Sequence, residues 1–277
     1  MYLRPRSLDE AVDALAIHGG RILAGGTDFY PALGDRPIAG NVIDISALDE
    51  LAGISVGPNE VRIGARATWS SIASAPLPRA FDALKAAARE VGSLQIQNLG
   101  TIAGNLCNAS PAADGIPPLL ALDAEVELQS RSGHRRIPLA EFVTGYRKTV
   151  ISPDEILTAV VVPRSIEGAS AFLKLGARRY LVISIAMVAA IVETDSQGCV
   201  SQARIAVGAC SAVAQRLRSL EEDLVGAPGR PGIGSSASLD HLASLSPIDD
   251  LRATADYRRN AALALVRRAL EACVLET

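Results

Sequence analysis

Two short glycine-containing turns carry residue types that could hold a phosphate. The first follows an expected strand and reads Leu23-Ala24-Gly25-Gly26-Thr27-Asp28, with no bulky side chain at its apex. The second reads Thr101-Ile102-Ala103-Gly104-Asn105. Small residues let backbone amides approach a ligand closely, and hydroxyl or amide side chains add donors. A Gly-Gly-Thr alone is more often an ordinary turn, but such turns can hold a phosphate or pyrophosphate without cationic side chains.

Other common chemistries lack the residues they need. Neither turn has the Gly-x-Gly-x-x-Gly spacing of a Rossmann site or the Gly-Lys-Ser/Thr of a P-loop. No Gly-x-Ser-x-Gly elbow is present, and the three histidines are scattered without a metal or triad pattern. The four cysteines lie too far apart in sequence for a zinc or iron–sulfur cradle. We therefore predict no metal site and no catalytic residue, and four free thiols favour a cytoplasmic location.

Composition excludes further classes. The chain has 277 residues, of which 49% are hydrophobic and 21% charged, with a formal net charge of −3. This mild acidity gives no electrostatic footprint for nucleic acid, and the composition is not that of a disordered chain. The longest apolar run covers residues 181–192, so we expect a buried strand there, because a membrane span needs roughly 20 residues. At roughly 150 residues per domain, the length predicts about two domains.

Capping and periodicity predict the elements around the two turns. Ser7 and Glu10 form a capping box before a helix that ends at Gly19-Gly20, and residues 21–24 form a strand leading into the first turn. Residues 99–118 are dense in turn formers without clear periodicity, and a loop of that length is usually functional. Further strands are expected at 42–45, 53–56, 61–65, 125–129, 135–137 and 156–162, with a helix at 78–91.

The last part of the chain has a different pattern. Strand-like segments are expected at 171–175, 182–194 and 200–209, and helices at 215–225 and 249–275. No alternating βαβα pattern and no internal repeat is present. We therefore predict an α+β chain with a boundary near residues 163–168.

The two turns together are much more specific than either alone. With residues 106–114 that come after the second turn, they resemble the FAD-binding (medium) subunit of the molybdenum hydroxylase family, of the xanthine dehydrogenase and carbon monoxide dehydrogenase flavoprotein type. The likeness continues through residues 118–124, 155–157 and 171–174 to Arg178-Arg179, and it covers essentially the whole chain.

This resemblance implies a domain plan. An FAD-binding domain of the vanillyl-alcohol-oxidase/PCMH type is expected at residues 1–165, with subdomains at about 1–57 and 58–165. A flavoprotein C-terminal α+β domain with a three-stranded sheet and helices is expected at residues 166–277.

The resemblance also implies cofactor contacts. In this family FAD lies between two subdomains, with its pyrophosphate held by the two glycine-rich loops. Asp114 matches an aspartate that contacts the cofactor, Leu157 a leucine that packs near the dinucleotide, and Lys174 a lysine near the flavin, where a cation can stabilise the anionic reduced form. Without the family pattern, Leu157 would be assigned to the core and Lys174 to a solvated strand. The expected FAD-binding residues are Leu23, Ala24, Gly25, Gly26, Thr27, Asp28, Phe29, Tyr30, Thr101, Ile102, Ala103, Gly104, Asn105, Asp114, Leu157 and Lys174.

One position departs from the family pattern. The second motif usually has Gly-Gly where this chain has Ala103-Gly104. If the first of these positions required a positive φ, alanine would cost roughly 1–2 kcal/mol there. If it does not, alanine is tolerated, so we expect Gly104 and Asn105 to be the closer contacts.

The implied function is electron transfer. The chain would be the FAD-carrying medium subunit of a multi-subunit molybdenum hydroxylase, passing electrons from iron–sulfur clusters to an external acceptor. Its expected partners are a small subunit with [2Fe-2S] clusters and a large subunit with molybdopterin, as a dimer of heterotrimers, and no nucleic acid or membrane span is expected. Two alternatives stay open: a self-contained FAD-dependent dehydrogenase of a small molecule, and a flavin-free assembly subunit.

Overall fold

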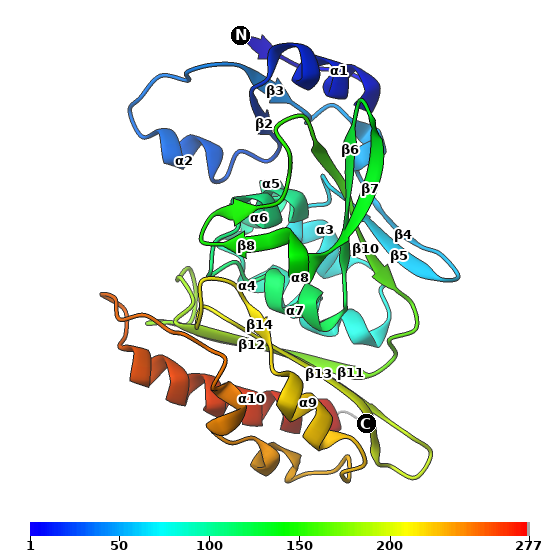
Figure 1. Ribbon diagram of the computed structural model, residues 1–277, viewed down its shortest axis with the longest axis vertical. Helices are drawn as coiled ribbons and strands as arrows, with labels where there is room; N and C mark the ends of the chain where they lie inside the picture. The colour runs from blue at the N-terminus through cyan, green and yellow to red at the C-terminus, as the bar shows by residue number, and fades with distance from the viewer. Residues whose placement is uncertain (276–277) are drawn as a thin grey trace.

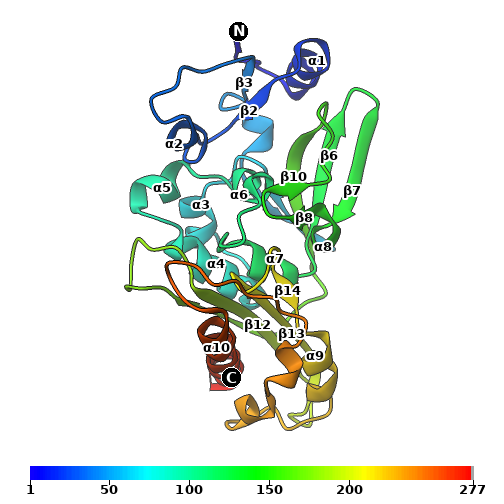
Figure 2. The ribbon, with the colours of Figure 1, turned by 60° about the vertical axis from the view of Figure 1, so that its left-hand side comes forward.

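The computed structural model describes residues 1–275 as three layers stacked along the long axis of the molecule (Figure 1). The first layer contains residues 1–51, the middle layer residues 52–165, and the C-terminal layer residues 166–275. Figure 2 shows the same order from a second direction. Among these residues, no helix combines the length and the apolar character needed to cross a lipid bilayer.

The first layer is a small parallel sheet with two helices beside it. Its strands pair in the order β1 (Tyr2–Leu3), β3 (Val42–Asp44), β2 (Arg21–Leu23), and its helices are α1 (Leu8–His18) and α2 (Phe29–Leu33). The predicted cap of α1 is confirmed, because the Ser7 hydroxyl accepts a hydrogen bond from the Glu10 amide at 3.2 Å. The Glu10 carboxylate accepts the amide of Arg6, one residue before the cap.

The middle layer is built on an antiparallel sheet. Its strands lie in the order β4 (Ile54–Val56), β5 (Glu60–Gly64), β10 (Ile156–Pro163), β6 (Glu125–Ser130), β7 (Gly133–Pro138), and a separate pair is formed by β8 (Val143–Gly145) and β9 (Lys148–Thr149). Its helices are α3 (Trp69–Ser74), α4 (Asp82–Glu90), α5 (Leu94–Leu99), α6 (Ile102–Asn108), α7 (Ile116–Ala121) and α8 (Leu139–Phe142). The 3-10 turn η2 (Arg79–Phe81) comes directly before α4, and the 3-10 turn η1 (Asp49–Leu51) ends the first layer. The predicted hairpin of β4 and β5 is confirmed.

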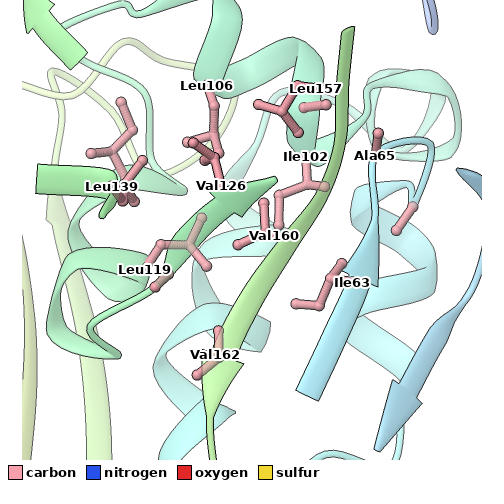
Figure 3. Packing of buried hydrophobic residues seen from close by; sticks show 14 of the residues in the cluster. Ile63, Ala65, Ile102, Leu106, Leu119, Val126, Leu139, Leu157, Val160 and Val162 are labelled. Carbon is pink, nitrogen blue, oxygen red and sulfur yellow. The ribbon is translucent and has the colours of Figure 1, made fainter. Parts of the chain in front are cut away.

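Side chains from distant parts of the sequence meet in the middle-layer core (Figure 3). Ile63 on β5 and Val160 on β10 pack with Ile102 and Leu106 on α6, and all four are completely buried. Burying such a side chain stabilises the fold by roughly 1.5–3 kcal/mol. This packing fixes α6, and with it the second glycine turn, against the central strand.

The prediction of a long irregular loop at residues 99–118 was wrong. The segment contains the whole of α6 and the start of α7, it begins at the last residue of α5, and only residues 109–115 between α6 and α7 are irregular over any length. The Ser93 and Thr101 side chains cap α5 and α6, and a proline lies in the first turn of α7. Each helix has only six or seven residues, which is too short to show a clear period of 3.6 in sequence.

The C-terminal layer is a four-stranded antiparallel sheet covered by helices. Its strands lie in the order β11 (Ala169–Leu175), β12 (Ala186–Thr194), β13 (Val200–Gly208), β14 (Gln215–Arg216). The helices are α9 (Arg218–Leu224) and α10 (Ala255–Leu275), with 3-10 turns η3 (Ile233–Ser236) and η4 (Asp240–Leu242) between them. The three expected strands are confirmed, and β14 is an addition where a helix was predicted.

Two boundaries in this layer differ from the prediction. β12 begins at Ala186 instead of residue 182. Leu181, with a positive φ of 53°, and Ile183 are exposed, so the chain is still in a loop at these residues. α10 begins at Ala255 instead of residue 249, since residues 249–254 form turns closed by hydrogen bonds to the Asp249 and Asp250 carboxylates.

The C-terminal sheet is buried on both faces. Phe172, Met187 and Ile191 belong to the core shared with the middle layer, whereas Val188 and Ala190 pack with α10 on the opposite face. Strands buried on both faces are apolar at nearly every position, which explains the long apolar run of β12. The sheet therefore lies between the middle layer and α10 (Figure 1).

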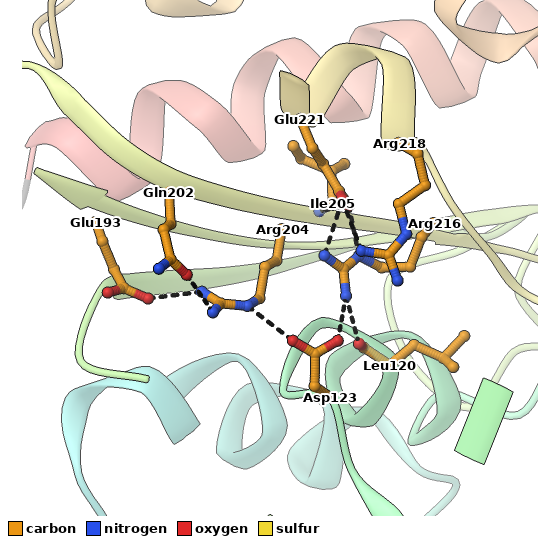
Figure 4. A network of polar contacts seen from close by, with 9 residues as sticks. All are labelled: Leu120, Asp123, Glu193, Gln202, Arg204, Ile205, Arg216, Arg218 and Glu221. Atoms are coloured by element: carbon orange, nitrogen blue, oxygen red, sulfur yellow. Dashed lines mark hydrogen bonds and ion pairs between the residues drawn. The ribbon is translucent and has the colours of Figure 1, made fainter. Parts of the chain in front are cut away.

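Polar contacts also join these two layers (Figure 4). Asp123 of the middle layer accepts hydrogen bonds from Arg216 at 2.7 Å and from Arg204 at 3.0 Å. Arg216 is itself paired with the buried Glu221 of α9, and Arg204 with Glu193. A buried pair of this kind tolerates little displacement, because separating it would leave a charge unpaired.

Candidate functional site

A cavity of about 750 Å³ opens between the first and middle layers. Both glycine turns line it, together with residues 151–153 and 155–157 at the start of β10. Cavities of about 300–1,000 Å³ are typical of cofactor and small-molecule sites. The two turns that were singled out from the sequence, about 75 residues apart, therefore form parts of one wall.

The first turn presents free backbone amides. Within the described residues, no protein acceptor takes the amide hydrogens of Gly25, Gly26, Thr27 or Asp28. Gly26 has a φ of +73°, and a Cβ at this position would lie 2.7 Å from the ring of Tyr30. Successive free amides in a turn form a concave site for an anion. This turn can therefore hold a phosphate group without a cation.

Gly25 sets how closely the two turns approach. A Cβ at Gly25 would lie 1.8 Å from the carbonyl oxygen of Leu99, which lies just before the second turn. Only glycine fits such a close backbone approach. Thr27 also lies where the two turns approach each other. A Cβ added to Gly100 would lie 3.4 Å from the hydroxyl oxygen of Thr27.

The second turn uses its amides within the protein. Its residues form the cap and first turn of α6, and the Thr101 side chain caps this helix. The hydrogen bonds from residues 102–105 are Ile102 to the Ala67 carbonyl, Ala103 to the Ala65 carbonyl, Gly104 to the Thr101 hydroxyl, and Asn105 to the Thr101 carbonyl. The expectation that both turns offer amide donors is thus met by the first turn and not by the second.

Asn105 is the polar group that the second turn offers instead. Its side-chain Oδ1 is buried without a hydrogen-bond partner, and the residue lines the cavity. Leaving a buried acceptor unpaired costs about 1–3 kcal/mol. A hydrogen-bond donor that reached this atom would satisfy it, and the free amides of the first turn suit an anionic group. The donor and acceptor groups of the wall residues therefore fit a polar ligand that carries an anionic group.

Ala103 causes no strain. It lies within α6, and it is not among the residues with positive φ. The alanine is 6% exposed and still lines the cavity. The departure from the family pattern at this position is therefore tolerated by the backbone.

Leu157 lines the cavity next to an irregularity in β10. The pairing of β10 with β6 shifts register between Leu157 and Ala159, with Thr158 as the extra residue. The Thr158 hydroxyl is held by Glu127 at 3.1 Å. Ile156 and Leu157, the first two residues of β10, come directly before this bulge and both line the cavity.

Asp114 and Lys174 are brought together, but away from this wall. Lys174 Nζ donates to Asp114 Oδ2 at 2.6 Å and to the Glu90 carbonyl at 3.2 Å, and the Ser184 hydroxyl donates to Asp114 Oδ1 at 2.6 Å. Burial raises the pKa of the Asp114 carboxyl, while Lys174 and Ser184 oppose the rise. Lys174 lines a second cavity of about 470 Å³ with Glu90 and Arg178. The C-terminal end of α4 therefore separates Lys174 from the first cavity.

Three other expected residues also lie outside the cavity wall. Leu23 is 5% exposed and Ile102 is completely buried, so both serve the core directly behind the turns. Tyr30 is exposed and contacts the ring of Phe29 edge to face, with ring centroids 5.3 Å apart. Eleven of the sixteen expected residues line the cavity itself: Ala24, Gly25, Gly26, Thr27, Asp28, Phe29, Thr101, Ala103, Gly104, Asn105 and Leu157.

Several wall residues were not expected from the sequence. Trp69, Val91 and Ile96 contribute apolar surface, and Arg21 and Glu155 contribute charge. A sequence signal exists only for Glu155, which belongs to the family-like segment 155–157, and for Trp69, which comes directly after the helix cap Thr68. The others come from positions whose spacing has no relation to the glycine turns.

Two of the wall residues have perturbed titration. The Arg135 guanidinium donates two hydrogen bonds, of 2.6 and 2.8 Å, to the Glu155 carboxylate. This pairing holds the pKa of the Glu155 carboxyl below its ordinary value. Cys107 is open to the cavity, but the surrounding protein desolvates its thiol and raises the pKa to about 12. Cys107 is therefore a neutral thiol at physiological pH, not a nucleophile.

Comparisons with known proteins agree on one family. Residues 1–165 match the family described as the FAD binding domain in molybdopterin dehydrogenase, and residues 171–273 match the CO dehydrogenase flavoprotein C-terminal domain. The nicotinate dehydrogenase FAD-subunit of Eubacterium barkeri is 39% identical, covering 82% of this chain and 80% of the relative. The nicotine 6-hydroxylase medium subunit of Paenarthrobacter nicotinovorans is 32% identical, covering 97% and 95%.

A solved structure is also similar throughout. A chain of the carbon monoxide dehydrogenase from Hydrogenophaga pseudoflava superposes with a TM-score of 0.90 at 30% sequence identity. The match covers 98% of this chain and 96% of that one, and that enzyme lacks the Mo-pyranopterin moiety of its molybdenum cofactor.

Proposed function

Because this chain belongs to the family of FAD-binding subunits of molybdopterin dehydrogenases, we propose that it binds FAD in the cavity between its first and middle layers and transfers electrons within a multi-subunit molybdenum hydroxylase. One observation carries the assignment of the site: residues 25–28, whose amides are free, and Asn105, whose buried Oδ1 has no hydrogen-bond partner, line the same cavity. The first suits a pyrophosphate and the second a hydrogen-bond donor of the cofactor.

The proposed contacts divide by chemistry. The amides of residues 25–28 bind the pyrophosphate, and Gly104 with Ala103 lets the cofactor approach α6 closely. Leu157 and Trp69 supply apolar wall that excludes water. Lys174 is paired with Asp114 and supplies a positive charge at the second cavity, which the C-terminal end of α4 separates from the first. FAD, when bound, supplies the redox chemistry, taking up electrons and releasing them to an acceptor.

We propose the partners from the relatives. Those proteins are described as FAD-subunits, medium subunits and medium chains of dehydrogenases and hydroxylases. This chain would accordingly work with a small subunit carrying [2Fe-2S] clusters and a large subunit carrying molybdopterin, as a dimer of heterotrimers in the cytoplasm, and an external acceptor would take the electrons. No disulfide joins cysteines within residues 1–275, as in proteins of reducing compartments.

We place the domain boundary between residues 165 and 166. We place the subdivision of the first domain near residue 52 instead of the expected residue 57, because β4 (Ile54–Val56) pairs with β5 in the middle-layer sheet. The linker between β10 and β11 runs from residue 164 to residue 168. The cavity lies between the first and middle layers, which is where a cofactor bound between two subdomains would be. The C-terminal domain contributes Lys174 beside the second cavity.

The test begins with the purified full chain. We expect a yellow protein that releases FAD, and not FMN, on denaturation in about equimolar amount. The flavin should be reducible by dithionite, yet the chain alone should not reduce dye with hydroxylase substrates. Co-purification from the native source should bring down two further subunits.

Two other results would contradict the proposal. Dye reduction by the chain alone with a small substrate would make it a self-contained dehydrogenase. A colourless chain that fails to take up added FAD would make it a flavin-free assembly subunit.

A further inference from the structure

Trp69 is the only tryptophan of the chain, and its ring lies between two glycines. The residue follows the Thr68 cap at the start of α3, and although it is only 1% exposed it lines the 750 Å³ cavity. A Cβ added to Gly100 would lie 3.3 Å from Cδ1 of the indole, and a Cβ added to Gly115 would lie 2.4 Å from its Cη2. A glycine therefore borders each end of the ring.

The contact at Gly115 concerns space and not backbone conformation. Gly115 has a φ of −76° and a ψ of −20°, and it directly precedes α7. Any residue adopts these angles without strain, so the backbone does not require glycine at this position. A separation of 2.4 Å, however, is far shorter than a van der Waals contact between carbon atoms. An alanine at position 115 would therefore displace the indole.

Gly115 also borders a second side chain of the cavity wall. A Cβ at Gly115 would lie 3.0 Å from Asn105 Oδ1, the buried oxygen that has no hydrogen-bond partner. Trp69 comes from α3 and Asn105 from α6, and both line the cavity. Because buried side chains are close-packed, one added methyl group would press on both of them.

The main chain is anchored on both sides of this contact. The Trp69 amide donates to the Gly100 carbonyl at 3.2 Å, which ties the start of α3 to the second turn. On the other side, Asp114 directly precedes the glycine and accepts hydrogen bonds from Lys174 and Ser184, each at 2.6 Å. The clash would therefore be relieved mainly by rotation of the indole, which changes the cavity wall that the ring forms.

We propose that Gly115 is a positioning residue of the cofactor site: because it has no side chain, the Trp69 indole and the Asn105 amide can lie side by side in the cavity wall. This inference rests on the proposed function. Gly115 does not itself line the cavity, so its effect on FAD passes through these two neighbours. The sizes of the residues at positions 69 and 115 are consequently interdependent.

The experiment is a double-mutant cycle on the full chain freed of flavin, with Gly115→Ala, Trp69→Phe and the double variant. In Gly115→Ala we expect the affinity for FAD, measured by flavin fluorescence, to fall about tenfold. Phenylalanine lacks the second ring of the indole, which the added methyl group would meet. The double variant should therefore bind FAD within about twofold of Trp69→Phe alone.

A second measurement does not depend on FAD. Trp69 supplies all the tryptophan fluorescence of the chain, so a shift of this emission in flavin-free Gly115→Ala reports movement of the indole. Gly145→Ala is the matched control, because a Cβ at Gly145 would come no closer than 3.8 Å to a side-chain atom of Lys148. The control should change neither the emission nor the affinity for FAD.

Several results would overturn the proposal. Equal losses of FAD affinity when Gly115→Ala is added to the parent chain and to Trp69→Phe would show that the two positions act independently. An unchanged emission, or full FAD affinity, in Gly115→Ala would also contradict it. If Gly115→Ala fails to fold, the double variant decides, because the smaller ring must then restore both folding and FAD binding. A parent chain that binds no FAD would contradict the proposed function instead, and the emission would still test the placement of the indole.

Discussion

The turn at residues 24–28 and the turn at residues 101–105 have similar compositions, yet they use their backbone amides in opposite ways. The first leaves the amides of residues 25–28 without a protein acceptor, and all four residues line the cavity. The second donates each amide from residue 102 to residue 105 to a protein acceptor. A glycine-rich composition therefore does not by itself identify an anion site, because the outcome depends on which acceptors the fold brings nearby.

The physical reason lies in the structure around each turn. Thr101 caps α6 directly, and two amides of this turn also meet carbonyls just past the end of β5. Asp28 precedes α2 without a side-chain cap, and no strand edge among the described residues accepts the amides of the first turn. The first turn is thus a binding element, and the second is a packing element that contributes Asn105 to the cavity.

A substitution at Gly25 should give the largest effect in a test of the contrast between the two turns. Gly25→Ala places a Cβ 1.8 Å from the Leu99 carbonyl oxygen, so the two turns must separate. We expect the free energy of unfolding to fall by about 3 kcal/mol. FAD affinity should fall about 100-fold, as measured by fluorescence titration of the flavin-free chain.

Gly145→Ala serves as the control for Gly25. Its nearest contact would be a side-chain atom of Lys148 at 3.8 Å, and its φ is not positive. This control should bind FAD normally. Near-normal FAD binding by Gly25→Ala would mean that the approach of the two turns is not needed for the site.

Asn105 should give effects of opposite sign on stability and binding. Asn105→Leu removes the unpaired Oδ1, so the flavin-free chain should gain about 1 kcal/mol in free energy of unfolding. FAD affinity should fall about tenfold, because the cofactor loses an acceptor. Denaturant unfolding and FAD titration measure the two effects separately.

Asn98→Leu, at an exposed position whose amide oxygen pairs with the Ser70 hydroxyl, is the control for Asn105. It should leave FAD affinity unchanged. A destabilised Asn105→Leu chain with full FAD affinity would show that Oδ1 serves the fold and not the ligand.

Thr101 should affect stability more than binding. Thr101→Val removes the hydroxyl that accepts the Gly104 amide at 3.1 Å, which should cost about 1 kcal/mol of stability. Because the amides of this turn face the protein, FAD affinity should change less than about threefold. Thr101→Ser keeps the oxygen and should behave like the parent chain. A large loss of FAD affinity in Thr101→Val alone would place the second turn among the binding elements after all.

The smallest effect is expected at Ala103. Ala103→Gly restores the residue usual in the family, but the position is helical with negative φ. Glycine should therefore cost about 0.5–1 kcal/mol in thermal or denaturant unfolding without improving FAD affinity. Tighter FAD binding by this variant would show that the alanine methyl obstructs the cofactor.

Local rules predicted much of the fold because the interactions they describe are local. The Ser7 cap, the hairpin of β4 and β5, and the three long C-terminal strands depend on residues close together in sequence. The same rules failed over residues 99–118, which contain α6 and the start of α7. The Thr101 cap and burial against β10 hold α6, whereas α7 packs against β12 and β13. Periodicity could not identify helices of six or seven residues.

For the site, the sequence by itself determined the two turns, the family and the residue types available for a pyrophosphate. Only the tertiary structure decided which amides are free, since the acceptors Ala65 and Ala67 lie more than thirty residues before α6. It also decided that Lys174 pairs with Asp114 across sixty positions. Hydrogen bonds and ion pairs form between neighbours in space, and spacing along the chain does not specify those neighbours.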